Sequence, residues 1–185
     1  MGMWMMSYKS ELFSFNFSNL IPCHITFFSY PFGEYSNLIK NYISKNFKFA
    51  FGQHSGVIDI NKDEFELPRF PINEKYGELK RFKSIINYYP LEYKRLLPIE
   101  KKLTKKNNPP KFEVEFFNEQ NNLKNINCYS NEGDKWEKSK TNVTDQILTI
   151  EFREPFKPRR GRINCSLYEN GKWRWFGIQF PIIQN

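Results

Sequence analysis

Few residues in this chain have the types and spacing that hydrolytic chemistry requires. A catalytic zinc site needs about three protein ligands and an open position for water, and the bound metal lowers the pKa of that water to about 7. The chain has two histidines, His24 and His54, which lie far apart in the sequence and form no helical pair. The sequence therefore predicts no metal site in this chain.

Other catalytic chemistries have no better candidates. Ser55 follows His54 within Gln53-His54-Ser55-Gly56, which differs from the Gly-x-Ser-x-Gly elbow of serine hydrolases. No glycine-rich phosphate loop is present. Two interpretations of His54 stay open: a hydrogen-bonded or surface histidine, which is the commoner case, or a contributor to a substrate groove.

The segment Trp173-Arg174-Trp175 is a further candidate for a binding surface. In a strand, both tryptophans lie on one face and Arg174 lies on the other. They could form a platform on which sugar rings stack, or they could pack inward. Because tryptophan burial dominates small cores, inward core packing is the favoured interpretation.

Two stretches of sequence carry a family resemblance. The first runs from Phe28 to Tyr35 through Tyr30-Pro31-Phe32-Gly33 and continues in residues 51–56 and 67–74, and the second comprises residues 161–165 and 173–180. Together they resemble bacterial polysaccharide deacetylases of the nodulation-type, family-four carbohydrate esterase class. The resemblance covers most of the chain and lies with the subgroup that has a β-rich domain after the catalytic barrel.

The resemblance implies a distorted (β/α) barrel that hydrolyses N-acetyl groups on amino-sugar polymers with a divalent metal, usually zinc. The family's aspartate pair and histidine pair would precede Ile25, where this chain has no Asp and only His24. We therefore expect a truncated protein that is inactive alone and has no cofactor of its own. A separately encoded N-terminal half could supply the missing residues, and a non-catalytic carbohydrate-binding module is the alternative function.

The resemblance also implies site residues. Ser29-Tyr30-Pro31-Phe32 stands where the family has an Arg-x-Pro-Tyr turn, so the backbone N–H of Phe32 would be the oxyanion donor. Arg69 would orient the base or meet an acidic sugar group. The expected substrate-binding set for an acetylated amino-sugar glycan is Tyr30, Pro31, Phe32, Gly33, His54 and Arg69.

The elements that would position these residues change in type along the chain. Apolar runs with helical and strand spacing predict a strand–helix–strand unit and then two further elements, over residues 25–30, 36–46, 47–51, 64–70 and 77–89. This order favours a parallel sheet, and residues 25–90 are expected to form part of the deacetylase barrel. Residues 1–24 have no clear pattern.

The second half of the chain has a different pattern. Residues 91–111 follow Pro90, combine three further prolines with paired basic residues and are expected to be a linker. Period-two alternation at 112–116, 148–152 and 163–168 predicts a small antiparallel β-sandwich over residues 112–185. Asn170-Gly171 predicts a type I′ hairpin turn between two of its strands. The expected fold class is therefore α/β followed by all-β.

Composition limits the partners. The net charge is +8, but Lys and Asn are spread over the whole chain, so we expect no nucleic-acid site. No apolar stretch is long enough to span a membrane. The three widely separated cysteines predict buried free thiols. The missing signal peptide indicates the cytoplasm, and an extracytoplasmic location stays open if the N-terminus is incomplete.

Overall fold

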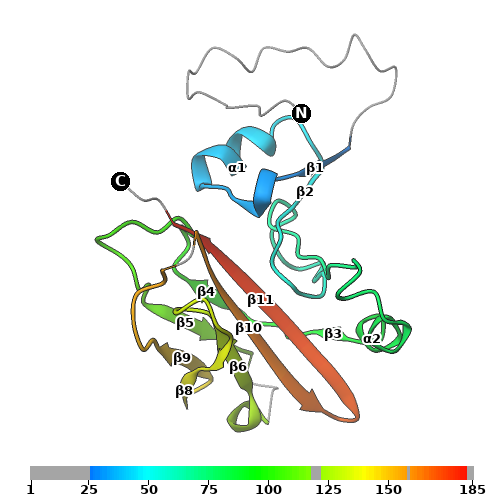
Figure 1. Cartoon of the computed structure of the whole chain (residues 1–185), viewed down its shortest axis with the longest axis vertical. Coiled ribbons are helices and arrows are strands. Elements are labelled where there is room, and N and C mark those ends of the chain that lie inside the picture. Colours follow the sequence, from blue (N-terminus) through cyan, green and yellow to red (C-terminus); the bar gives the residue numbers. More distant parts are fainter. Residues whose placement is uncertain (1–25, 118–121, 158, 183–185) are drawn as a thin grey trace.

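The computed structural model describes residues 26–117, 122–157 and 159–182. It is mostly β, with 36% of residues in strands and 13% in helical segments, so helices are too few to alternate with strands around a barrel. The predicted partial (β/α) deacetylase barrel is therefore wrong. Figure 1 shows instead a long hairpin that lies between a small αβ layer and a four-stranded sheet.

The αβ layer comprises residues 26–88. It begins with β1 (Phe27–Ser29), a 3₁₀ turn (Pro31–Gly33), α1 (Asn37–Ile43) and β2 (Phe49–Phe51). β1 and β2 pair in parallel, which confirms the predicted strand–helix–strand unit. The Ser36 side chain caps α1 by accepting a hydrogen bond from the Ile39 N–H at 3.4 Å, as Ser at an N-cap typically does.

Parallel pairing stops early in this layer, which is why no barrel forms. After β2, the parallel contact continues only as an isolated bridge between Phe51 and Leu67. The other described helix, α2 (Leu79–Ile85), buries none of its side chains. A helix with no buried side chain cannot cover a barrel strand, because that packing requires an apolar stripe against the sheet.

The rest of the described chain forms two antiparallel-rich sheets. The five-stranded sheet has the order β3 (Tyr89–Pro90), β11 (Lys172–Pro181), β10 (Arg160–Glu169), β6 (Asn127–Ser130) and β7 (Glu137–Lys138). The four-stranded sheet has the order β4 (Arg95–Leu97), β5 (Phe112–Glu115), β9 (Ile147–Glu151) and β8 (Lys140–Thr144). A 3₁₀ turn (Leu123–Asn125) precedes β6.

One apolar core lies between these two sheets. Val114 and Leu148 of the four-stranded sheet and Ile163 and Phe180 of the five-stranded sheet are all buried in it. Residues 91–111, expected to be a linker, contribute β4 and three buried leucines to the same core: Leu91, Leu96 and Leu103. Several charged residues lie between these leucines in the sequence, which is why the segment resembles a solvated linker.

The β10–β11 hairpin confirms the predicted turn. Ten residue pairs join the strands, and Asn170 and Gly171 have φ values of 51° and 74°. Positive φ at both positions is the requirement of a type I′ turn, which matches the right-handed twist of the strands.

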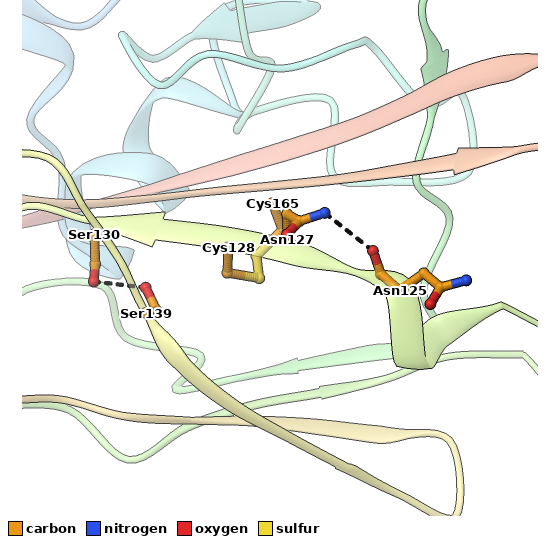
Figure 2. Close-up of a disulfide and its surroundings, with 6 residues drawn as sticks. All are labelled: Asn125, Asn127, Cys128, Ser130, Ser139 and Cys165. Carbon is orange, nitrogen blue, oxygen red and sulfur yellow. Dashed lines mark hydrogen bonds between the residues drawn. A yellow bond between two sulfur atoms is a disulfide. The ribbon is translucent and has the colours of Figure 1, made fainter.

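A disulfide joins β6 and β10 inside the sandwich (Figure 2). Cys128 and Cys165 lie directly opposite each other on the paired strands, and neither has any exposed surface. Beside them, the buried hydroxyls of Ser130 and Ser139 lie 2.7 Å apart. The predicted burial of these two cysteines is confirmed, and the prediction that they are free thiols is wrong. Cys23 lies outside the described residues.

Candidate functional site

Tyr30, expected in a substrate groove, packs inside the αβ layer. Its side chain is 1% exposed, and its ring lies 4.6 Å from the Tyr35 ring. Its hydroxyl donates a hydrogen bond of 3.2 Å to the Phe65 carbonyl. Burial raises the pKa of this phenol well above its usual range. Tyr30 therefore holds the layer together, and its ring is not available to a ligand at the surface.

The Pro31-Phe32-Gly33 turn fastens the αβ layer to the β10–β11 hairpin. The Phe32 carbonyl accepts hydrogen bonds from Arg160 Nη1 at 2.8 Å and from Gln179 Nε2 at 3.2 Å. Gln179 Nε2 also donates to the Gly33 carbonyl at 3.0 Å. Pro31 and the Phe32 ring stay exposed, with the ring beneath the Arg159 guanidinium at 4.3 Å.

His54 lies apart from this turn, in the wall of a cavity of about 320 Å³ between the αβ layer and the sandwich. Burial, and then the nearby Lys101 charge, lower the pKa of His54 to about 4, so its imidazole is neutral at pH 7. The Arg69 backbone N–H donates to the His54 carbonyl at 3.0 Å, while Arg69 itself is exposed. The structure thus joins His54 and Arg69 through the backbone only.

Two lysines in the wall of this cavity already have polar partners. Lys40 Nζ lies 2.7 Å from Asp63 and 2.6 Å from Glu66. Lys101 Nζ donates to the carbonyls of Pro98 and Ile99 at 2.7 and 3.2 Å. These contacts stabilise the packing of the layer and leave both lysines without a free charge for a ligand.

The described residues do not fit a zinc ion. Within residues 26–117, 122–157 and 159–182, no group of three His, Cys, Asp or Glu side chains is arranged to hold a metal. Since a zinc site requires about three such donors, no step of catalysis is assigned to a metal in this chain.

Trp173 and Trp175 both point away from the sandwich core, so the expectation of inward core packing is wrong. Trp175 is partly buried against the αβ layer, where its Nε1 donates to the Ser55 carbonyl at 3.2 Å and its ring stacks on Tyr88 at 5.9 Å. Trp173 is 44% exposed, and its ring lies 5.1 Å from the Tyr168 ring on the paired strand.

Trp173 belongs to a partly solvent-facing surface, which we call the open face. Cys128 and Cys165 point inward, so the strand alternation turns their neighbours Tyr129 and Asn164 outward as a directly opposed pair. The aromatic members Tyr129, Tyr168 and Trp173 are 43%, 55% and 44% exposed. The open face comprises Asn127, Tyr129, Arg162, Asn164, Ser166, Tyr168 and Trp173.

Sequence reasoning found part of this face. The predicted period-two alternation at 163–168 places Asn164, Ser166 and Tyr168 on the side opposite Ile163 and Cys165, and the structure confirms that pattern. Tyr129 was missed because β6 is too short to show alternation and is not adjacent to β10 in the sequence.

Comparison of the chain with family models, with curated proteins and with solved structures gives no match. None of the helices in the described part of the chain has the length and hydrophobicity of a membrane-spanning segment.

Proposed function

We propose that this chain binds an acetylated amino-sugar glycan on the open face, as a non-catalytic part of a polysaccharide deacetylase-related protein. The observation that carries the proposal is the exposed ring pair of Tyr168 and Trp173, 5.1 Å apart on adjacent strands. Large exposed aromatic side chains on a rigid sheet are a recurring feature of recognition surfaces.

The chemistry of the face suits a sugar. A pyranose ring presents apolar C–H bonds on its faces and hydroxyls at its rim. Tyr and Trp supply rigid area for the C–H faces at a low cost in conformational entropy. The neighbouring side chains Asn127, Asn164 and Ser166 supply donors and acceptors for hydroxyl and acetamido groups.

The choice of an amino-sugar glycan rests on the family resemblance of the sequence. The segments that carry it lie in the αβ layer and in the β10–β11 hairpin, which contact each other through Gln179 and Trp175. A glycan on the open face would therefore lie beside the αβ layer, which carries the first of these segments.

Titration with N-acetylglucosamine oligomers, followed by tryptophan fluorescence and calorimetry, tests the proposal. We expect Trp173→Ala and Tyr168→Ala each to weaken binding at least tenfold. Tyr42→Ala is the matched control, because Tyr42 is an exposed aromatic residue (51%) on α1. No signal from the wild-type chain at millimolar oligomer would contradict the proposal. Release of acetate from a chitooligosaccharide by the zinc-supplemented chain would contradict its non-catalytic part.

A further inference from the structure

Three arginines at the start of β10 differ in how they are paired. Arg159 Nε lies 2.7 Å from Glu34, and Arg160 donates to the Phe32 carbonyl and to Gln53 Oε1. The guanidinium of Arg162 has no hydrogen-bond or ion-pair partner among the residues that the structure describes, and its Nε is buried. Unsatisfied buried donors are rare in folded proteins and call for an explanation.

Arg162 lies on the open face, in line with the sugar-stacking residues. It has the same strand parity as Asn164 and Tyr168, so all three side chains leave β10 on one side. At about 3.4 Å per residue, Arg162 lies about 20 Å from Tyr168 along the strand. The register partner of Arg162 on β11 is Gln179, which the αβ layer covers, so a glycan that covers Tyr168 would reach Arg162 along the β6 side of β10.

The surroundings of Arg162 favour an incoming anion. Burial, and then the adjacent Arg160 charge, lower the pKa of the Arg162 guanidinium, while Tyr76 opposes this shift, and no carboxylate of the described residues forms an ion pair with Arg162. Arginine presents a planar fork of N–H donors that matches a carboxylate in two parallel hydrogen bonds.

We propose that Arg162 binds the carboxylate of an acidic sugar residue, so the glycan on the open face contains uronic acid. This inference rests on the proposed function and specifies the ligand class. The open face then has an aromatic end at Trp173 and Tyr168 for the sugar ring faces, and a cationic end at Arg162 for the carboxylate.

Two probes of equal length separate this inference from the proposed function. Hyaluronan oligosaccharides alternate N-acetylglucosamine with glucuronate, and chitooligosaccharides contain N-acetylglucosamine alone. At low salt, we expect the wild-type chain to bind the hyaluronan oligosaccharide at least tenfold more tightly. Arg162→Gln should remove that preference, because it should weaken hyaluronan binding far more than chitooligosaccharide binding. Arg69→Gln is the control, because Arg69 is exposed on the αβ layer and not on the open face.

Each outcome decides something. Equal wild-type affinity for the two oligosaccharides, or an equal loss of both in Arg162→Gln, would overturn the carboxylate site and leave glycan binding in place. Binding of neither oligosaccharide would overturn the carboxylate site and the proposed function together. If Arg69→Gln also lost the preference for hyaluronan, that preference would come from the positive net charge of the chain, and the specific carboxylate site would be overturned.

The disulfide carries a second, independent inference. Cys128 and Cys165 are fully buried register partners at the centre of the five-stranded sheet, with no exposed surface on either residue. Disulfides form and persist in oxidising compartments, while cytosolic thiols are kept reduced. We infer that the chain folds in an oxidising compartment. There the two thiols would lose two protons and two electrons to the disulfide of a thiol-oxidising protein, which would leave as a dithiol.

Differential alkylation of the chain taken from its native cells tests this inference. The cells are quenched in acid, the protein is unfolded and alkylated, then reduced and treated with a second alkylating reagent of different mass. We expect peptides containing Cys128 and Cys165 to carry only the second reagent. The first reagent on both cysteines would overturn the inference.

Discussion

Trp173 and Trp175 lie two residues apart on β11 and point to the same side of the sheet, but their surroundings differ. Trp175 is covered by the αβ layer through the Ser55 carbonyl and the rings of Phe70 and Tyr88. Trp173 contacts the Tyr168 ring and keeps 44% of its side chain exposed. One face of β11 thus has two roles. The end at Trp175 stabilises the contact between the sheet and the αβ layer, and the end at Trp173 is accessible to a ligand.

The covered end continues along β11 through Gly177 and Gln179. A Cβ atom at Gly177 would lie 2.1 Å from the Ser55 carbonyl oxygen, so only glycine permits this approach of the layer. Gln179 is 2% exposed and binds the turn at Phe32 and Gly33. We therefore expect changes at the covered end to alter stability and changes at the open face to alter binding.

The largest loss of unfolding free energy is expected on the inner face of the same sheet, where the disulfide lies. Cys128 and Cys165 are 37 residues apart in the sequence, and closing a loop of that length stabilises a protein by about 4 kcal/mol in the chain-entropy model. The double variant Cys128→Ala, Cys165→Ala should lose about that much free energy of unfolding in urea. Reduction of the unfolded wild-type chain before refolding is the control and should give a similar loss. A loss below about 1 kcal/mol would show that the bond does not stabilise the sandwich.

Gly177→Ala tests the covered end. Because the new methyl group would clash with the backbone of Ser55, we expect a loss of about 3 kcal/mol, the upper range for overpacking. In Gly133→Ala, a Cβ meets the movable Glu154 carboxylate at 2.9 Å, and the loss should stay within about 0.5 kcal/mol. Equal effects in the two variants would contradict close packing between the αβ layer and β11.

His54 should make the covered end sensitive to acid. Its pKa is about 4 when folded, against an ordinary value of 6.5, so the unfolded chain binds the proton more readily. The contribution of neutral His54 to the free energy of unfolding is fully present above pH 6.5 and is lost as the pH falls towards 4. The loss is about 2 kcal/mol between pH 7 and pH 5. Urea unfolding of wild-type and His54→Gln chains at both values measures this. The variant should lack this part of the pH dependence, and an identical dependence would exclude His54 as its source.

The smallest stability effect should be at the open face. Trp173→Ala removes a side chain that is 44% exposed and contacts the Tyr168 ring, so its free energy of unfolding should change by no more than about 1 kcal/mol. Trp175→Ala removes packing and a hydrogen bond and should cost about 2 kcal/mol. A larger loss for Trp173→Ala than for Trp175→Ala would reverse the comparison between the two ends.

Local sequence patterns predicted the parts of the fold that neighbouring residues determine. Asn170-Gly171 specifies its turn because both positions require positive φ, and the alternation at Ile163–Leu167 specifies which side chains face the core. The Ser36 cap and the apolar spacing after it predicted α1. Each of these features depends on contacts within a few residues.

The missed features depend on pairing between distant segments. Cys128 meets Cys165 because β6 pairs with β10, although three strands separate them in the sequence. Trp173 and Trp175 have the same parity and residue type, and only the position of the αβ layer distinguishes them. The barrel prediction was wrong for a related reason: a strand–helix–strand unit is compatible with any parallel sheet, and local sequence does not show where pairing stops.

The most direct test of glycan binding at the open face is the NMR signal of each tryptophan indole during titration with N-acetylglucosamine and hyaluronan oligosaccharides. Single Trp-to-Phe variants assign the signals. We predict that the Trp173 signal shifts and saturates, while the Trp175 signal, whose N–H is bonded to the Ser55 carbonyl, does not move. An unchanged Trp173 signal at millimolar concentrations of both oligosaccharides would contradict the account.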